Sequence, residues 1–469
     1  MLKKLFVNTS VYVIGPQLPR LITLFIYPLL TQHLTAFDYG IYGLIISYMA
    51  SLNVAKDLGL RILLYNSFYK YPFRYKMIWK KLHGIMVLWS VPFLLICSGV
   101  IYITIPDAAG NNTSLIILLN CIPILLFDNT SMIGDTLFRL KEKPVPVVSI
   151  NIVAGLISIA CTFTTIVYFK MGYIGWFISS FISSFATFLP YCYYIYIKDN
   201  FFPLFNINFQ MVKQNLKISL PTIPHNLAGQ LLNVGDRIMM ENLKVDVNKI
   251  GLYNMAYIVG NYFSFFETAA GMAIGPMYMR YYSNKDEINA RKLTFLTQFL
   301  FLLVTFIACL WIKEIFYVLV KNPELQSAYY LAVIIIMSFN YKPLFIASTN
   351  ILFYKEKTTD ILKISFSSAV MNLILNLIFI PVFGIIASAV ITFLCFMFMG
   401  VYGFYLKNYR INVKLNYYQG YWLIAIIATT ILAYLAKDIQ PLFKIVVTSA
   451  LCLISFILFK KYKHIFPTE

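Results

Sequence analysis

Ten ionisable residues lie within long apolar stretches of the sequence, and their side-chain types indicate what chemistry these positions support. They are Arg20, Lys56, Asp57, Arg61, Asp128, Asp135, Asp236, Arg237, Glu267 and Lys342. A charge at the centre of a bilayer costs at least about 2.5–3.5 kcal/mol, so such residues normally face a protein interior or a watery pathway. Arginine binds phosphate oxygens bidentately, and a buried carboxylate can exchange a proton when its surroundings change. The set therefore predicts a transport pathway.

Polar residues also recur at helical spacing along the seventh apolar stretch. Its polar residues are Thr222, Asn226, Gln230, Asn233 and Arg237. Intervals of three and four residues place side chains on one face of a helix. Such a face either lines a polar pathway or joins neighbouring helices by hydrogen bonds.

The second and fourth apolar stretches carry charges at the same spacing. Asp57 and Arg61 lie four residues apart, as do Asp135 and Arg139. Asp57 and Arg61 either belong to the pathway or neutralise each other one helical turn apart. We expect Asp135 and Arg139, near the inner end of their stretch, to form a surface pair.

The composition determines what kind of element must position these groups. Hydrophobic residues make up 60% of the 469 residues, charged residues 12%, and the mean hydropathy is +0.73. Soluble chains average about 45–50% apolar and about 25% charged residues, and disordered chains have few aromatic residues, against 17% here. At about 20 apolar residues per span, the sequence predicts an all-α polytopic membrane protein of about 14 transmembrane helices. The predicted spans are 8–31, 40–64, 83–105, 114–137, 147–169, 174–197, 218–240, 250–281, 293–318, 328–353, 361–380, 384–406, 417–435 and 442–459.

The net charge of +19 is distributed unevenly between the connectors. With these spans, 26 basic residues fall on the side of the amino terminus and 7 on the other side. Cytoplasmic loops carry the excess of Lys and Arg, so both termini are predicted to be cytoplasmic. Short basic connectors between apolar stretches argue against a nucleic-acid partner. The seven cysteines form no CxxC pair, and we interpret them as packing residues rather than metal ligands.

A weak internal repeat divides the chain. Gly40-Ile41-Tyr42 opens the second predicted span and Gly251-Leu252-Tyr253 opens the eighth, 211 residues later. An even number of spans separates the two motifs, which predicts two parallel repeats. We therefore expect a six-helix bundle over 1–200, a second six-helix bundle over 201–410, and two additional helices over 411–469.

Four short motifs resemble those of a known family. They are Phe37–Tyr42, Lys56–Leu60, Asp236-Arg237 and Gly251–Ala256. The sequence is similar in these motifs, and in its layout of spans, to the polysaccharide (O-antigen) flippases, often called Wzx. These belong to the superfamily that includes the multidrug and toxin extruders.

The resemblance implies a fold and a cargo. The fold is two six-helix bundles around a central cavity that opens alternately to the two sides of a bacterial inner membrane. The cargo is undecaprenyl pyrophosphate carrying an oligosaccharide, flipped to the outer leaflet for lipopolysaccharide or another polysaccharide. Membrane lipid and polysaccharide-assembly proteins are the expected partners. A proton or sodium gradient would drive transport, with no other cofactor.

The resemblance also suggests roles for the polar residues. The expected pyrophosphate ligands are Arg20, Arg237, Lys342 and Arg61, with the first two as principal clamps. The residues expected to face the sugar are Asn226, Gln230 and Asn233. The carboxylates expected to couple transport to an ion are Asp57, Asp128 and Glu267. A competing interpretation is that Arg237 only neutralises Asp236 and extends to the outer interface.

Two other functions remain open. A multidrug extruder of the same superfamily would have an apolar, acidic cavity, which the basic residues within the spans argue against. A membrane-embedded glycosyl polymerase would need a large outer loop, whereas the longest predicted outer loop has about ten residues. Because no loop is long enough to form an enzyme site, a secondary transporter is the favoured prediction.

Overall fold

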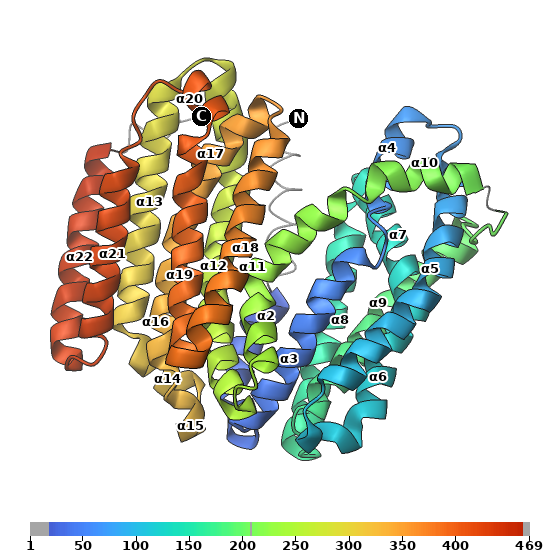
Figure 1. Ribbon diagram of the computed structural model, residues 1–469, viewed down its shortest axis with the longest axis horizontal. Coiled ribbons are helices and arrows are strands. Elements are labelled where there is room, and N and C mark those ends of the chain that lie inside the picture. Colours follow the sequence, from blue (N-terminus) through green and yellow to red (C-terminus); the bar gives the residue numbers. More distant parts are fainter. Residues whose placement is uncertain (1–17, 207–208, 463–469) are drawn as a thin grey trace. The chain divides into compact units, whose positions relative to one another are not determined.

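The computed structural model of the chain describes residues 18–206 and 209–462 (Figure 1). Within these residues the secondary structure is helical, with turns and no strands. Nine of the described helical segments are long and apolar enough to cross a membrane. Five further helices, α2, α3, α11, α12 and α22, lie within or overlap the remaining predicted spans, and residues 8–17 of the first predicted span lie outside the described residues. The chain is therefore a multi-pass membrane protein, and the predicted all-α class is confirmed.

The helices divide between two compact units. The first unit comprises 1–230, 246–251 and 319–322, and the second comprises the rest of the chain. The helices in the sequence of the first unit are α2 (Leu18–His33), α3 (Ala36–Leu52), α4 (Arg61–Lys70), α5 (Tyr75–Thr104), α6 (Thr113–Ile122), α7 (Asp128–Leu140), α8 (Pro144–Phe163), α9 (Ile174–Cys192) and α10 (Phe209–Ser219). Helix α11 (Thr222–Asn242) begins in the first unit and ends in the second.

The remaining helices belong mainly to the second unit. They are α12 (Val247–Ser283), α13 (Glu287–Leu310), α14 (Ile312–Leu319), α15 (Pro323–Gln326), α16 (Tyr329–Ser338), α17 (Lys342–Tyr354), α18 (Thr358–Phe383), α19 (Ile385–Tyr402), α20 (Lys407–Asn412), α21 (Gln419–Ala436) and α22 (Pro441–Tyr462). Each predicted span contains one of these helices or a short series of helices, because apolar length alone determines where a chain can cross a bilayer.

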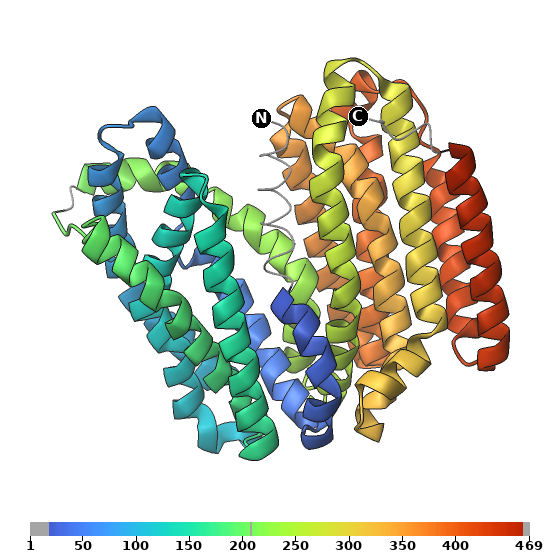
Figure 2. The ribbon, with the colours of Figure 1, turned by 180° about the vertical axis from the view of Figure 1, so that it is seen from behind.

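Apolar side chains of α3, α5, α6 and α9 form the main core of the first unit. Ile41, Phe93, Cys97, Ile116 and Phe177 are buried in it. Helices α8 and α9 pack side by side, as both ribbon views show (Figures 1 and 2). Three helices of this unit continue into π-helical turns, at Pro123–Phe127, Thr164–Tyr168 and Tyr193–Lys198.

The second predicted span, 40–64, is not one helix, which corrects the sequence prediction. Helix α3 ends at Leu52, a 3₁₀ turn follows at Asn53–Ala55, and α4 begins only at Arg61. Leu58 (φ 53°) and Gly59 (φ 69°) adopt the left-handed conformation between them. A Cβ at Gly59 would lie 2.5 Å from the Ser219 carbonyl oxygen, so the backbone at the C-terminal end of α10 packs directly on this break.

The repeated glycines meet in a reciprocal contact within the first unit. The repeat of 211 residues relates Ala36 to Val247 and Gly40 to Gly251. A Cβ at Gly40 would overlap the Val247 carbonyl oxygen, and a Cβ at Gly251 would overlap the Ala36 carbonyl oxygen. Val247, which contacts Gly40, and Ala36, which contacts Gly251, are thus themselves related by the repeat. This symmetry supports the internal repeat that the sequence suggests.

The same symmetry extends to the helix N-termini beside the glycines. Thr35 caps α3, where its hydroxyl accepts a hydrogen bond from the Asp38 amide at 3.3 Å. Its counterpart Asp246 precedes α12 and accepts a hydrogen bond from the Asn248 amide at 2.9 Å. Both helices therefore begin with a side-chain acceptor that satisfies an amide of the first turn.

Helices α16–α19 form the packed centre of the second unit. The predicted span 328–353 is interrupted by a 3₁₀ turn at Phe339–Tyr341, which separates α16 from α17. Asn340 in this turn receives a hydrogen bond from Gln298 at 2.9 Å and exchanges hydrogen bonds with Thr305. Side chains of α13 thereby supply hydrogen bonds to the backbone and the side chain of Asn340. The break lies inside the membrane region, where unpaired polar groups are costly.

Ion pairs attach the last two helices, α21 and α22, to α14. The side chain of Lys444 is 1% exposed, and its ammonium group lies 2.8 Å from both carboxylate oxygens of Glu314. It also donates to the Lys437 carbonyl oxygen at 2.7 Å. The buried charge of Lys444 is therefore paired and hydrogen-bonded, as a buried ammonium requires.

Asp438, in the turn between α21 and α22, forms a second connection. It accepts hydrogen bonds from Lys313 at 2.9 Å and from Tyr329 at 2.8 Å. Partial burial raises the pKa of Asp438, but hydrogen bonds from Lys313, Tyr329 and Lys437 outweigh this effect and lower the pKa to about 2. The carboxylate therefore stays charged at neutral pH.

Candidate functional site

The helix break of the first unit brings a lysine to a carboxylate on a neighbouring helix. Lys56 follows the 3₁₀ turn at Asn53–Ala55, and Asp128 begins α7 directly after the π-helical turn at Pro123–Phe127. The Lys56 ammonium lies 2.9 Å from an Asp128 carboxylate oxygen, and both side chains are about one-quarter exposed. The pair is net neutral and retains contact with solvent.

A cavity of about 210 Å³ lies beside this pair, within the first unit. Its polar lining residues are Asn53, Asn120, Asp128, Ser180 and Ser184. Its remaining lining residues are Ile46, Met49, Ala50, Leu119, Pro123 and Ile124. Three segments of chain, α3 with its 3₁₀ extension, α6–α7 and α9, therefore contribute to one partly polar pocket.

Arg61 and Asp57 have different partners. The Arg61 guanidinium donates to Asp135 at 2.9 Å, and Asp135 also accepts from Arg139 on its own helix. The Asp57 carboxylate instead accepts a hydrogen bond from the Gly59 amide at 3.0 Å, inside the break. The predicted Asp135–Arg139 pair is confirmed. The neutralising Asp57–Arg61 pair required a continuous helix, which the break at 53–60 removes.

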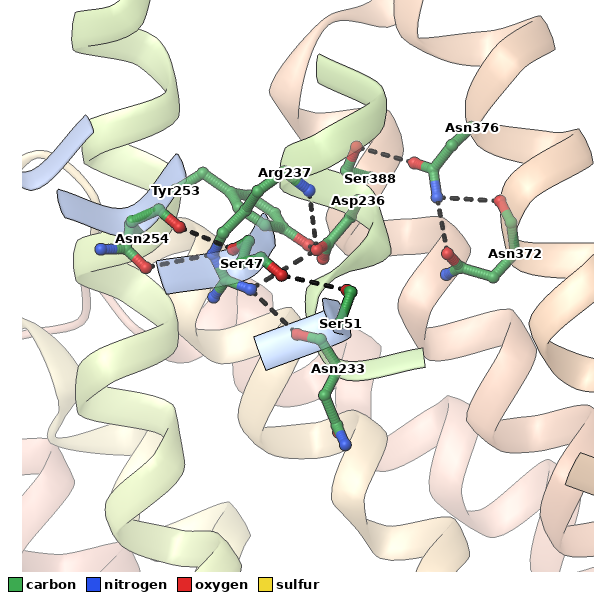
Figure 3. Close-up of polar contacts among 11 residues, drawn as sticks. Ser47, Ser51, Asn233, Asp236, Arg237, Tyr253, Asn254, Asn372, Asn376 and Ser388 are labelled. Carbon is green, nitrogen blue, oxygen red and sulfur yellow. Dashed lines mark hydrogen bonds and ion pairs between the residues drawn. The ribbon is translucent and has the colours of Figure 1, made fainter. Parts of the chain in front are cut away.

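The second unit holds a buried polar cluster around Asp236 and Arg237 of α11 (Figure 3). These two residues are 1% and 4% exposed. Asp236 accepts a hydrogen bond from the Tyr253 hydroxyl. Arg237 donates to the Asn254 side chain at 3.0 Å and to the Asn233 carbonyl oxygen at 2.9 Å. Both charges are therefore satisfied by neighbours within the unit.

The Arg237 guanidinium also lies over an aromatic ring of α12. Its central carbon is 4.2 Å from the centre of the Tyr257 ring, close enough for a cation–π interaction. Arg237 is thus held inside the protein rather than extended to an interface. The sequence identified Asp236 and Arg237 as candidate residues, but not their partners Asn254 and Tyr257. The only available signal was that Asn254 lies within the Gly251–Ala256 motif and Tyr257 directly follows it.

Lys342 begins α17, immediately after the 3₁₀ turn that divides its predicted span. Its ammonium lies 4.7 Å from the centre of the Phe339 ring and 5.4 Å from that of Phe396. Its side chain is half-buried. Aromatic faces attract a cation through the ring quadrupole, so Phe339 and Phe396 help to position this side chain.

Polar residues on one face of α18, among them Ser368, Asn372 and Asn376, join this helix to α19. Ser368 donates to the Cys395 carbonyl oxygen of α19 at 2.8 Å. Ser388 of α19 donates to Asn376 at 2.8 Å, and Asn376 donates to Asn372, as Figure 3 shows. Hydrogen bonds of this kind are a common way for helices to associate in membranes.

The other predicted site residues are distributed along α2, α11 and α12. Asn226 and Asn233 are exposed and Gln230 is half-buried, all on α11. The side chains of Arg20 on α2 and Glu267 on α12 lie outside the residues whose side chains the structure describes. The first unit holds two separate ion pairs, Lys56–Asp128 and Arg61–Asp135, and the second unit holds the cluster of Asp236, Arg237 and their partners.

Comparison with known proteins gives one family and one fold. Residues 2–282 match the family described as polysaccharide biosynthesis protein. No curated protein has a sequence that matches this chain. The fold is similar to that of the lipid II flippase MurJ in an inward closed conformation, with a TM-score of 0.71 at 13% identity, over 96% of this chain and 99% of that chain.

Two MATE transporters have related folds. An inward-facing MATE transporter of the MOP superfamily is similar with a TM-score of 0.61 at 13% identity, over 90% of this chain and 99% of that chain. The Vibrio cholerae MATE transporter VcmN, in the form of a point mutant, gives a TM-score of 0.53 at 13% identity, over 89% of this chain and 98% of that chain. At these identities the likeness establishes the fold alone.

Proposed function

The chain belongs to the family of polysaccharide biosynthesis proteins, and from this premise we propose that it flips a lipid-linked oligosaccharide across a membrane. The proposed cargo is an undecaprenyl-pyrophosphate-linked repeat unit. It would move from the inner to the outer leaflet of a bacterial cytoplasmic membrane, by alternating access. The observation that carries the proposal is the family match on a chain whose described residues include nine helical segments long and apolar enough to cross a membrane.

The small size of the connections between the helices explains why transport, rather than synthesis, is the proposed step. The connection between α9 and α11 is the longest between the described spans, and it folds into the 11-residue helix α10. A glycosyl polymerase would need an extramembrane region that holds two sugar substrates, and no described connection is that large. Similarity to a lipid II flippase fold supports the same choice.

Basic residues within the helices are the proposed ligands of the pyrophosphate. Arg61 contacts Asp135 through one nitrogen of its guanidinium group, and 44% of the Arg61 side chain is exposed. A phosphate can therefore reach the other guanidinium nitrogens. Lys342 supplies a cation in the second unit. Arg20 and Arg237 complete the proposed set. The exposed Asn226 and Asn233 and the half-buried Gln230 remain the proposed sugar contacts on α11.

Ion exchange at a carboxylate within the membrane is the proposed driving step of the transport cycle. A proton or sodium ion would exchange at Asp57, Asp128 or Glu267 as access alternates. The membrane potential supplies about 2.3 kcal/mol per charge per 100 mV for such a cycle. Replacing each carboxylate by its amide tests the role, because the coupling residue should lose the pH or sodium dependence of transport in proteoliposomes.

The test of the cargo is complementation of cells that lack the gene. We expect Arg20→Ala, Arg61→Ala and Lys342→Ala to reduce surface polysaccharide and to raise the intracellular lipid-linked oligosaccharide. Arg61→Lys should restore activity only partly, since loss of a charge-assisted hydrogen bond costs about 1.5–3 kcal/mol. Surface polysaccharide is measured at matched membrane protein levels.

Arg139→Ala is the matched control for Arg61, because both arginines pair with Asp135. It removes one partner of Asp135 but no proposed cargo ligand, and it should complement fully. Full complementation by all three alanine variants would contradict the proposed pyrophosphate ligands. If deletion of the gene changes drug tolerance and leaves surface polysaccharide unchanged, the chain is instead a multidrug extruder.

The proposed orientation has its own test. We expect single cysteines at positions 110 and 322 to react with an impermeant thiol reagent from outside intact cells, and cysteines at 75 and 410 to be protected. The reason is the basic excess on the side of the amino terminus. Labelling is read on a variant without the seven native cysteines. Equal labelling at 75 and 110 would show that the orientation is wrong.

A further inference from the structure

The cavity of the first unit has features that the proposed ion and pyrophosphate sites do not require. We propose that it is a sugar subsite, which takes one monosaccharide of the lipid-linked oligosaccharide and holds it through Asp128 and Asn120. This inference rests on the proposed flippase function and deepens it. The cavity of about 210 Å³ is smaller than the roughly 300–1,000 Å³ of drug-sized pockets, which suits a single sugar ring.

A π-helical turn brings the two polar residues onto one face. Asn120 lies in α6 and Asp128 begins α7, with the π-helical turn Pro123–Phe127 between them. Eight residues of regular α-helix would rotate the second side chain by about 80° from the first. The extra residue of a π turn reduces the offset to about 20°, and such turns are frequent at functional sites. Both residues consequently line the cavity.

Two other segments also place pairs of residues on the cavity. Ser180 and Ser184 lie four residues apart on α9, and Met49 and Asn53 lie four apart at the end of α3. Each pair occupies one helix face, and all four residues line the cavity. Hydroxyl and amide groups therefore alternate with apolar surface around the pocket, as expected for a ligand with both hydroxyl groups and C–H faces.

The charges beside the cavity suit two other ligand classes less well. A metal ion that stays bound would have to displace the Lys56 ammonium from the Asp128 carboxylate, 2.9 Å away. A phosphate group would gain little, because the carboxylate that lines the cavity already holds the neighbouring ammonium. A neutral polyhydroxyl ligand meets neither obstacle, since each hydroxyl can donate to Asp128 and accept from another group. The Asn120 amide nitrogen donates to the Ile116 carbonyl oxygen at 2.8 Å, which leaves its side-chain oxygen to accept.

The sugar role and the ion-coupling role of Asp128 predict different defects. If Asp128 binds sugar, Asp128→Asn lowers the affinity for the cargo but leaves the pH and sodium dependence of transport intact. If Asp128 couples transport to an ion, the dependence flattens and cargo affinity is unchanged. Lys56 acts here as a positioning residue, because it orients the carboxylate and does not itself line the cavity.

The experiment compares two ligands on the purified full chain in nanodiscs. The ligands are lipid-linked oligosaccharide extracted from cells lacking the gene, and undecaprenyl pyrophosphate without sugar, with affinities measured by native mass spectrometry. We expect wild type to bind the sugar-bearing lipid at least about tenfold more tightly. Asp128→Asn and the cavity-filling Ala50→Leu should each abolish this preference and leave the affinity for the bare lipid unchanged.

Asp199→Asn is the control, because the Lys141–Asp199 pair has nearly the same distance and exposure as Lys56–Asp128 but lies outside the cavity. It should keep the preference. The double variant Lys56→Gln/Asp128→Asn repeats the test without an unpaired lysine. Equal wild-type affinities for the two ligands, or a preference that survives both Asp128→Asn and Ala50→Leu, would overturn the subsite. Failure of wild type to bind either lipid would overturn the flippase proposal itself.

Discussion

Replacing Gly251 by alanine is expected to prevent accumulation of folded protein. The added methyl group would overlap the Ala36 carbonyl oxygen, which belongs to the first turn of α3 and cannot rotate away. Overpacking of a filled interior costs about 1–3 kcal/mol when side chains can adjust, and a clash with backbone is harder to relieve. Gly40→Ala should act similarly, since its methyl group would overlap the Val247 carbonyl oxygen.

The measurement is the yield and melting temperature of detergent-solubilised protein. Gly99→Ala is the control, because no atom lies within 4 Å of a Cβ at this helical glycine of α5. Alanine is about 1 kcal/mol more favourable than glycine in a helix interior, so this variant should fold at least as well as wild type. Normal yield and melting temperature for Gly251→Ala would show that the contact between α3 and the first turn of α12 is not close-packed.

Asp236→Asn is expected to destabilise the second unit by about 3–5 kcal/mol, because it leaves the Arg237 charge buried without its counter-ion. Arg237 has no access to water that could compensate, since it is 4% exposed. The double variant Asp236→Asn/Arg237→Gln removes both charges and keeps hydrogen-bonding groups for Tyr253 and Asn254. It should recover most of the lost melting temperature.

Transport by the double variant then separates two roles of Arg237. If Arg237 only neutralises Asp236, the stable double variant restores surface polysaccharide. If Arg237 also binds the pyrophosphate, the double variant recovers its melting temperature but does not restore surface polysaccharide. Lys313→Gln/Asp438→Asn serves as the control. This ion pair is more than 40% exposed on both sides, and such pairs contribute only about 0.2–1 kcal/mol. Unchanged stability of the Asp236→Asn single variant would refute the buried-pair argument.

The lengths of the apolar stretches predicted the spans, because apolar length is a property of each helix alone. The prediction failed at 53–60, where Lys56, Asp57 and Gly59 lie among apolar residues and were assigned to one continuous span. The left-handed conformation of Leu58 and Gly59 accompanies the packing of the Ser219 backbone against the break. A contact between Gly59 and a residue so distant in the chain leaves no trace in local sequence. The spacing of Asp57 and Arg61 was misleading for the same reason, since it implies proximity only in an unbroken helix.

The polar sites show the same division between local and distant information. Spacing identified Asp128, Asp236 and Arg237 as unusual, because a charge in an apolar stretch is visible in one segment of sequence. Their partners Lys56 and Tyr253 come from other helices. Periodicity within a helix tells which residues share a face but not which helix that face meets. The cavity of the first unit, assembled from three separate segments, could not be predicted for this reason.

The pairing of Lys444 with Glu314 sets an order of events during biogenesis. Glu314 is synthesised 130 residues before its partner. At translation rates of roughly 5–20 residues per second, the carboxylate waits on the order of 10 s for Lys444. During that interval it must be satisfied by water or by the insertion machinery, because the lysine that holds both of its oxygens has not yet been made. The C-terminal hairpin thus closes the second unit last, and nascent chains that stall before residue 444 expose an uncompensated carboxylate to quality control.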